Sequence, residues 1–567
     1  MLTKSRILFL LLLLLAIVLR SYHLDWDQGY QIHPDEKIIF ISALPLHSVH
    51  TLAQFLSPDS PLNPKFFIYG SFPLYTIKFL SIIVSFFYHT LSEEQVYILG
   101  RMFSVGFDVG TLITLYYIGK QLLNKTFGML VAFLYTCSVL PIQASHFYTV
   151  DGIVTFFITL TLYMLLLFYE KRTIWKALLI GVFAGLALST KYTAVLLVLP
   201  VAVLLFLPCF TFSIKKRSVT ATVFFKPLFY AMVYGIAIAS LAAGTFILWN
   251  PYAFLDSSQF WQQLVLPSRM THDPFTYPFT LQFVGMIRYW YESKNIFLWG
   301  EGPVLGTLSF SGIGVLCISL WKRKEVQATK WLPFMLFFWI YFLVVGSFAV
   351  GFIRYMLPVY PLLALFGGYV VREMYRAIVK NYPRVRKVSL GIFIVAVLLY
   401  PLSFVHIYTK PHTLIQASDW IVKHIPPGKT IMTEVGDIQL PLYDKEKYTN
   451  ITITPYDPDT PQKQGQVKQA LERADYLILA SGRSYIPLPK LTDCKKLPLD
   501  SCYPFMAKYY RNLFDGSLGF KKIAEFTDYP QVPFTHLAIN DDSADETFIV
   551  FDHPKVMIFK KYEKNQK

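Results

Sequence analysis

Long apolar runs alternate with short basic clusters along the first 408 residues of this chain. Many of these runs approach the roughly 18 to 20 residues that a helix needs to cross a bilayer. The pattern therefore predicts a polytopic α-helical membrane protein with about eleven membrane-spanning helices. The predicted spans are residues 5–22, 101–122, 126–144, 151–169, 177–190, 192–207, 228–249, 302–321, 331–350, 355–371 and 388–408.

One further apolar segment, residues 72–91, is long enough to cross but carries Lys78. Counting it as a span would invert every later segment, so the distribution of Lys and Arg decides, because cytoplasmic loops are enriched in both. If the segment lies along the membrane interface, all basic clusters fall on the side of Lys4 and Arg6. These clusters are Lys120/Lys125, Lys171/Arg172/Lys176, Lys215/Lys216/Arg217, Lys322/Arg323/Lys324/Lys330 and Arg372/Arg376/Lys380/Arg384/Arg386/Lys387.

The same threading divides the chain into two predicted domains. Residues 1–408 form the membrane domain, whose first outer loop, residues 23–100, contains interfacial helices. Residues 409–567 alternate short apolar runs, at 430–434, 476–480 and 547–551, with polar and Pro-rich turns, and residues 416–425 are amphipathic. This pattern predicts an α/β domain outside the cytoplasm.

Composition agrees with this assignment. Of the 567 residues, 54% are hydrophobic, 17% aromatic and only 16% charged, and the mean hydropathy is +0.43. These values exclude an ordinary soluble domain and a disordered chain. The formal net charge of +16 comes mostly from the loop clusters, so it reports topology and predicts no nucleic-acid partner.

Cysteines and the N-terminus add two expectations. Cys494 and Cys502 lie close together in the polar part of the chain, where an oxidising compartment would permit a disulfide. No CxxC or Cys/His zinc spacing occurs. The apolar run at residues 7–19 resembles a signal peptide, but no small-residue cleavage motif follows before Asp25, so we interpret it as a retained first span.

Three acids are candidates for chemistry. Asp35 and Glu36 follow His33 and Pro34, and Pro34 favours a helix start that places both acids at the positive end of the helix dipole. Asp151 begins a predicted span, where an ionised group is costly unless it is paired or hydrated. Simpler interpretations stand beside these: the first two acids can be solvated loop residues, and Asp151 can merely cap its helix.

Three cations share the predicted outer side. Lys191 interrupts an apolar run of some thirty residues, and Arg354 opens another run. Both violate the positive-inside tendency, and outward-facing cations in the headgroup zone suit an anionic ligand. Lys65 is a weaker candidate, for which snorkelling to lipid phosphate is the alternative. Carboxylates and cations around one cavity can deprotonate a hydroxyl and stabilise a phosphate leaving group.

Several motifs in this order resemble a known family. They are His33-Pro34-Asp35-Glu36, Tyr69-Gly70-Ser71-Phe72-Pro73-Leu74-Tyr75, residues 101–108, residues 146–151, residues 185–192 and Arg354-Tyr355-Met356-Leu357-Pro358. The series is similar to the GT-C-fold glycosyltransferases that use polyprenyl-phosphate sugars. Within these it is nearest the bacterial and archaeal relatives of the dolichyl-phosphate-mannose protein mannosyltransferases.

The resemblance covers about residues 6–375 and implies roles for individual residues. Asp35, with Glu36 beside it, would deprotonate the acceptor, and Asp151 would contribute to the same site. Lys191, Arg354 and Lys65, in that order, would bind the lipid-linked phosphate. No metal site is assigned: a divalent metal ion is left open as a cofactor, with His33 or His146 as a ligand, but no spacing demands one.

These observations lead to a hypothesis of inverting glycosyl transfer on the outer membrane face, from a polyprenyl-phosphate-linked hexose such as mannose. The acceptor would be a protein, lipid or glycan hydroxyl, and membrane lipids surround the protein. An alternative is a transporter or flippase of a lipid-linked anionic glycan, which also needs intramembrane charges. No inverted repeat supports that alternative. A non-catalytic scaffold would leave Asp35, Asp151 and Lys191 unexplained.

Overall fold

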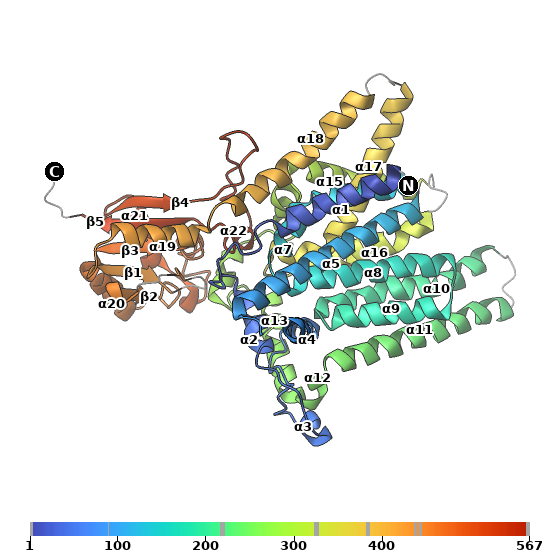
Figure 1. Cartoon of the computed structure of the whole chain (residues 1–567), viewed down its shortest axis with the longest axis horizontal. Helices are drawn as coiled ribbons and strands as arrows, with labels where there is room; N and C mark the ends of the chain where they lie inside the picture. Colours follow the sequence, from blue (N-terminus) through green and yellow to red (C-terminus); the bar gives the residue numbers. More distant parts are fainter. Residues whose placement is uncertain are drawn as a thin grey trace.

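The computed structural model describes residues 4–88, 90–215, 221–322, 328–381, 386–435, 439–441 and 445–562. A bundle of long helices forms one part, and a small sheet covered by helices lies at one end of it (Figure 1). The N-terminal end of α1 lies at the opposite end of the bundle from the sheet. Of the basic residues assigned to the cytoplasm, Lys216, Arg217, Arg323, Lys324 and Arg384 lie outside the described residues.

Each predicted span coincides with helical structure. Six helices are long and apolar enough to cross a bilayer among the described residues, or seven if the pair α6 and α7, bent by 64°, is one span. The chain is therefore a polytopic membrane protein, while the number of eleven spans stays a prediction. The helices are α1 (Lys4–Ser21), α5 (Glu93–Leu122), α6 (Lys125–Thr136), α7 (Val139–Ser145), α8 (Val150–Glu170), α9 (Ile174–Leu188), α10 (Val198–Lys215), α11 (Ala221–Trp249), α15 (Pro303–Trp321), α16 (Ala328–Val345), α17 (Tyr360–Asn381) and α18 (Arg386–Val405).

One ion pair inside the bundle connects α1 to α5. Arg20 of α1 forms a buried ion pair with Asp108 of α5, and the Tyr135 hydroxyl donates to the same carboxylate at 2.5 Å. The Arg20 guanidinium also donates to the carbonyls of Tyr135 and Thr136. An unpaired charge at such a position would cost several kcal/mol, roughly, so this cluster fixes α1 against α5 and α6.

The apolar segment at residues 72–91 forms α4 (Phe72–Phe87), which has only 16 residues. It appears nearly end-on in Figure 1, whereas the long helices of the bundle run across the view. Lys78 donates a 2.7 Å hydrogen bond from Nζ to the carbonyl of Leu44 in the first loop. Length, direction and this contact all favour the interfacial position predicted from the charges.

Short elements between the spans build the region next to the sheet. They come from the first loop, from the segment after α11, and from the segments before α15 and α17. They are α2 (Pro34–Ala43), α3 (Leu52–Leu56), η1 (Tyr192–Leu197), α12 (Tyr252–Leu255), α13 (Ser257–His272), η2 (Pro278–Phe283), α14 (Trp290–Asn295), η3 (Ile296–Gly300) and η4 (Ile353–Val359).

The C-terminal part contains a five-stranded sheet of order β2-β1-β3-β5-β4. β1 pairs in parallel with β2 and β3, while β5 is antiparallel to β3 and β4. The run at residues 547–551, expected to belong to an alternating α/β pattern, enters a short helix whose Phe548 is fully buried. The elements are η5 (His406–Thr409), α19 (Thr413–His424), β1 (Thr430–Glu434), η6 (Lys445–Lys447), β2 (Thr449–Ile453), α20 (Pro461–Arg473), β3 (Tyr476–Leu479), η7 (Leu488–Lys490), η8 (Leu499–Ser501), α21 (Pro504–Phe514), β4 (Phe520–Phe526), α22 (Glu546–Ile549) and β5 (Val556–Lys561).

The C-terminal part packs directly on the bundle. One buried apolar cluster runs from the spans through Leu414 and Ile431 to Ile558. Cys494 and Cys502 form the disulfide that their spacing suggested. The division at residues 408 and 409 stays a prediction, because the core continues across it.

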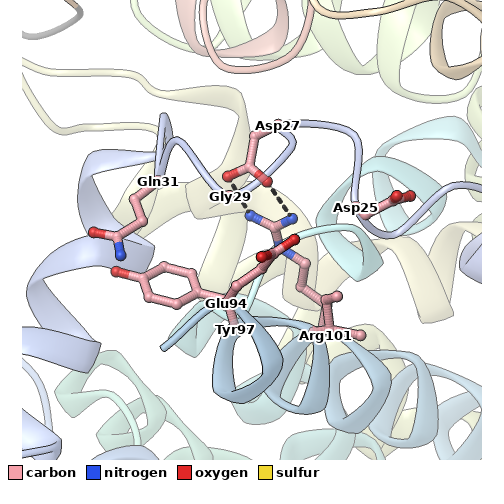
Figure 2. Close-up of a pocket in the computed structure, with 8 residues that line it drawn as sticks. Asp25, Asp27, Gly29, Gln31, Glu94, Tyr97 and Arg101 are labelled. Carbon is pink, nitrogen blue, oxygen red and sulfur yellow. Dashed lines mark hydrogen bonds and ion pairs between the residues drawn. The ribbon is translucent and has the colours of Figure 1, made fainter. Parts of the chain in front are cut away.

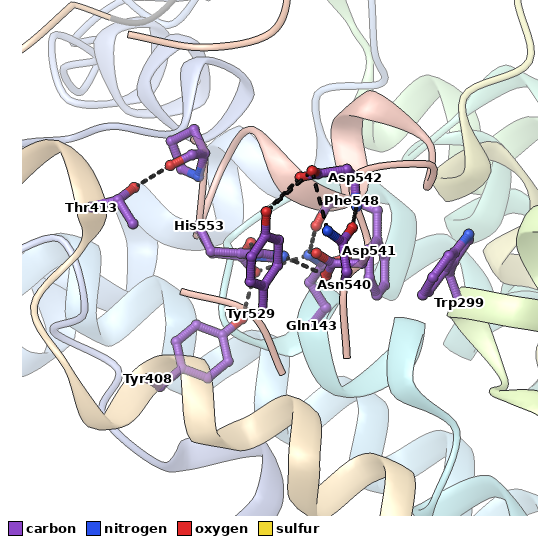
Figure 3. A network of polar contacts seen from close by, with 12 residues as sticks. Gln143, Trp299, Tyr408, Thr413, Tyr529, Asn540, Asp541, Asp542, Phe548 and His553 are labelled. Carbon is purple, nitrogen blue, oxygen red and sulfur yellow. Dashed lines mark hydrogen bonds and ion pairs between the residues drawn. The ribbon is translucent and has the colours of Figure 1, made fainter. Parts of the chain in front are cut away.

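A buried polar network also joins the two parts (Figure 3). The amide of Gln143 in α7 donates to Asp552 at 2.9 Å, and the hydroxyl of Tyr408 donates to the same carboxylate at 2.9 Å. His553 lies between Asp552, at 2.5 Å, and Asp541, at 2.9 Å. Burial alone would lower the pKa of His553, but the two carboxylates raise it to about 10. A charged imidazolium therefore lies between two acids at this interface.

The predicted threading can be tested by cysteine labelling. In intact cells, a membrane-impermeant maleimide is expected to label Ser257→Cys and Ser517→Cys, and to label Gln121→Cys only after permeabilisation. The physical reason is that only this threading places every basic cluster inside. Labelling of positions 121 and 257 from the same side would show that the threading is wrong.

Candidate functional site

A cavity of about 640 Å³ lies between the bundle and the C-terminal part. Its walls come from the first loop, η1, α13, η2, α16, η4 and the segments around β3 and α22. Most lining side chains are apolar or aromatic. The charged groups among the described lining residues are Asp35, Lys191, Arg354 and Arg483.

Asp35 is held by the start of α2. Pro34 occupies the first helical turn, and His33 caps the helix, its Nδ1 accepting the N–H of Glu36 at 3.3 Å. The Asp35 carboxylate forms an ion pair with Arg354. Burial raises the pKa of Asp35, but Arg354, together with His33 and Arg483, outweighs this effect and leaves the pKa below its usual value. Asp35 is therefore ionised in the unliganded cavity.

Arg354 lies on the 3₁₀ turn η4, which contains Pro358 and leads into α17. Its guanidinium is surrounded by the rings of Phe352, Tyr355 and Phe551, at 5.3 to 5.9 Å from the ring centroids. Its Nε is buried and has no hydrogen-bond partner among the described residues. A buried donor without a partner is costly, so Arg354 retains capacity for an anionic ligand.

Lys191 pairs with Asp151 through a contact of 2.6 Å between Nζ and Oδ1. The same ammonium lies 4.5 Å from the centroid of the Tyr355 ring. Tyr355 therefore neighbours both cations, and Tyr341 steadies it by donating to its carbonyl at 2.9 Å. Asp151 itself is buried, does not line the cavity, and acts on it through Lys191.

Glu36 does not point into the cavity, although it is adjacent to Asp35 in sequence. It is fully buried and accepts two hydrogen bonds from Arg101, at 3.0 and 2.7 Å. Arg101 also holds Asp27 through two hydrogen bonds (Figure 2), at 2.9 and 2.8 Å. Consecutive helix residues face different directions. The proposed catalytic role beside Asp35 therefore lacks geometric support, and Glu36 instead anchors the first loop.

Lys65 is likewise outside the cavity lining. Its Nζ contacts Asp256 at 3.0 Å and Asp59 at 3.3 Å, and its side chain is 43% exposed. The Lys65 carbonyl accepts hydrogen bonds from Gln259 and Gln263 of α13. These contacts connect the first loop to α13. They do not bring Lys65 to the cavity that contains Lys191 and Arg354.

Arg483 was not identified from the sequence. It lies in the loop after β3, forms an ion pair with Glu546, and contacts the ring of Phe551 at 5.5 Å from the centroid. A charged residue shortly after a buried strand is a weak signal, and the sequence gives no indication that this loop reaches the bundle. Tyr69 and Tyr355 also line the cavity, although the motifs contained them without a role.

The two candidate histidines are buried and make contacts within the protein. Both ring nitrogens of His146 contact backbone carbonyls, those of Ile142 at 2.9 Å and Tyr22 at 3.0 Å. The His33 ring lies between the rings of Phe147 and Phe551, tilted by 42° and 37° to them, and its Nδ1 accepts the N–H of Glu36. Within the described ranges, no three His, Cys, Asp or Glu side chains gather as a metal site. The ionised groups of the cavity are instead arranged as carboxylate–cation pairs.

Comparison with known proteins finds a family match over part of the chain. Residues 76–244 match the family model described as dolichyl-phosphate-mannose-protein mannosyltransferase. A search of curated proteins finds no match.

Several solved structures are similar to this chain at low sequence identity. The oligosaccharyltransferase of Archaeoglobus fulgidus tethered with an acceptor peptide is 12% identical, with a TM-score of 0.50 over 98% of this chain and 88% of that one. ArnT from Cupriavidus metallidurans bound to undecaprenyl phosphate is 12% identical, with a TM-score of 0.42 over 86% and 95%. The S. cerevisiae Pmt1-Pmt2 protein O-mannosyltransferase complex is 15% identical, with a TM-score of 0.34 over 48% and 36%.

The resemblance indicated by the sequence motifs is confirmed. The order of the motifs, the helical architecture and the match over residues 76–244 agree with one another. Residues 76–244 resemble the dolichyl-phosphate-mannose-protein mannosyltransferases, and the chain has the GT-C fold of polyprenyl-phosphate-dependent glycosyltransferases.

Proposed function

We propose that this protein transfers a hexose from a polyprenyl-phosphate carrier to an acceptor hydroxyl, on the outer face of the membrane and with inversion at the anomeric carbon. The observation that carries the proposal is the cavity in which Asp35 pairs with Arg354 and Lys191 pairs with Asp151 around one tyrosine, Tyr355. A carboxylate next to two cations supplies both a base and a site for a phosphate.

The donor phosphate binds between Lys191 and Arg354. Charge-assisted hydrogen bonds from an ammonium and a guanidinium are roughly twice as strong as neutral ones. The unpartnered Nε of Arg354 provides one donor for the ligand. The apolar walls formed by Leu264, Val345 and Phe348 suit the beginning of the lipid chain.

Arrival of the phosphate changes the state of Asp35. In the unliganded cavity the Arg354 guanidinium is paired with Asp35, so the carboxylate is held by an ion pair. The negatively charged phosphodiester of the donor competes for the guanidinium and releases the Asp35 carboxylate toward the sugar. The base thus becomes available only when the donor is bound, which limits wasteful hydrolysis.

The chemical step then follows with its atoms balanced. Asp35 accepts the proton of the acceptor hydroxyl, and the acceptor oxygen attacks the anomeric carbon on the face opposite the phosphate. The bond between the anomeric carbon and the phosphate oxygen breaks, and its electron pair leaves with the polyprenyl phosphate. Lys191 and Arg354 stabilise the charge that develops on the leaving phosphate. Asp151 positions Lys191 without touching the substrate.

The proposal is tested with purified protein, a polyprenyl-phosphate hexose and a panel of hydroxyl-bearing acceptors. We expect release of polyprenyl phosphate together with a new glycoside of inverted configuration. Activity is expected to survive a chelator such as EDTA, because the charges of the cavity are balanced by Arg and Lys side chains. Movement of intact donor across a vesicle membrane, without cleavage of the glycosyl bond, would favour a transporter and contradict the proposal.

A further inference from the structure

A smaller pocket, of about 230 Å³, lies at the carboxyl ends of the three parallel strands. Val435 directly follows β1, residues 454–457 follow β2, and Arg483 belongs to the loop after β3. In open sheets with parallel strands, ligands bind in the crevice beyond the carboxyl ends, where neighbouring connections diverge. The strand order β2-β1-β3 places such a divergence beside β1.

This smaller pocket, which we call the outer pocket, adjoins the cavity that contains Asp35. Phe279 and Arg483 line both spaces. The Arg483 guanidinium lies 5.9 Å from the centroid of Phe279 and pairs with Glu546. A molecule seated at the ends of the strands can therefore extend one of its groups past these two side chains toward the base.

The walls of the outer pocket match the chemistry of a sugar ring. Phe279 and Tyr456 supply aromatic faces, and Asp457 supplies a carboxylate that is exposed at the rim. The Tyr456 hydroxyl donates to the carbonyl of Arg483 at 2.6 Å, which fixes the aromatic ring against the loop after β3. Aromatic faces suit the C–H surfaces of a pyranose, and charged groups bind its hydroxyls. A peptide adding a strand would instead need a sheet edge.

We propose that the outer pocket binds the acceptor and that the acceptor is a saccharide, held by Tyr456, Phe279 and Asp457 while one of its hydroxyls reaches Asp35. This inference rests on the proposed glycosyl transfer and adds the acceptor class to it. The C-terminal sheet thereby takes part in acceptor recognition, while the bundle retains the donor.

The test compares three variants of the full-length protein. Tyr456→Leu removes the aromatic face, Tyr456→Phe retains it, and Tyr562→Leu is the matched control. The Tyr562 hydroxyl also donates to a backbone carbonyl, that of Gly516 at 2.8 Å, but the residue lines neither cavity. Saturation-transfer NMR with methyl glycosides of mannose, glucose, galactose and N-acetylglucosamine measures binding without requiring catalysis.

We expect Tyr456→Leu to weaken binding of at least one glycoside and to raise the acceptor KM about two- to tenfold, the value of one aromatic contact. The donor KM should not change, and Tyr562→Leu should behave as wild type. Tyr456→Phe retains the ring but loses the hydrogen bond to Arg483, so it should weaken glycoside binding less than Tyr456→Leu does. Asp457→Asn, at an exposed rim position, gives a second test if Tyr456→Leu fails to fold, and it should also raise only the acceptor KM.

Two results would overturn the inference while leaving glycosyl transfer intact. One is an acceptor KM that has the wild-type value in both Tyr456→Leu and Asp457→Asn. The other is transfer to a Ser/Thr-containing decapeptide but to none of the glycosides. If the wild-type protein bound a glycoside but released no polyprenyl phosphate from the donor, the proposed function would fail while the saccharide pocket would stand.

Discussion

Asp35→Asn protein is expected to bind the polyprenyl-phosphate donor and to transfer its sugar about a hundredfold to ten-thousandfold more slowly than wild type, the usual effect of losing a positioned general base. The amide has the shape of the carboxylate and can still accept a hydrogen bond from Arg354, so the cavity should be retained. It cannot take the proton of the acceptor hydroxyl at neutral pH. Single-turnover release of polyprenyl phosphate measures the rate, and donor titration measures binding.

Asp59→Asn is a suitable control for this experiment. Asp59 is also an acid of the first loop paired with a cation, Lys65, but its side chain is 92% exposed and lies outside the cavity. It should retain full activity. Turnover near the wild-type rate in Asp35→Asn would remove Asp35 from the role of base, and Asp151, which acts on the cavity through Lys191, would be the next acid to test.

The pH dependence provides an independent check of the same step. Arg354 keeps the pKa of Asp35 below its usual value in the unliganded protein, whereas burial acts in the opposite direction. A donor phosphate that occupies Arg354 removes much of the lowering effect, so the pKa of Asp35 should rise in the complex. The acidic limb of kcat, which reports the complex, is therefore expected at higher pH than the acidic limb of kcat/KM, which reports the free enzyme.

Much of the helical architecture could be predicted from local pattern. Each predicted span coincides with helical structure, because an apolar run of bilayer length has few alternatives to a helix. The pairing of Asp35 with Arg354 spans 319 residues of sequence, yet the sequence placed both on one side of the membrane. The predicted topology assigns Asp35 and Arg354 to the same face of the membrane. Tertiary packing then brings them into one cavity.

Other features could not be predicted, because they depend on the direction in which each side chain points in the folded protein. Glu36 is next to Asp35 in the chain, but the turn of α2 directs it to Arg101. Lys65 is predicted to lie on the same side as these residues, but its ammonium pairs with Asp256, from a segment nearly two hundred residues away in the chain. Arg483 enters the cavity only because the loop after β3 faces the bundle. A single sequence does not indicate which of several charged side chains will line a cavity in the folded protein.

The second large effect is expected for donor binding at the phosphate site formed by Lys191 and Arg354. Arg354→Met and Lys191→Met are each expected to weaken donor binding by about 1.5 to 3 kcal/mol, the value of a charge-assisted hydrogen bond, or about ten- to a hundredfold. Both cations neighbour the ring of Tyr355, so a phosphate there can contact both. Lys65→Met is the control, and because Lys65 lies outside the cavity lining, its donor affinity should be unchanged.

Each single substitution also leaves a buried acid without its partner, which by itself destabilises the fold. The paired variants Arg354→Met/Asp35→Asn and Lys191→Met/Asp151→Asn separate the two effects, because each removes the charge of both partners. If the cations bind the donor, both double variants should fold like wild type and still bind the donor ten- to a hundredfold more weakly, about the loss of the single variants. A double variant that regains full donor affinity would instead show that its cation only balances the charge of the neighbouring acid, and the phosphate contact would then belong to the remaining pair.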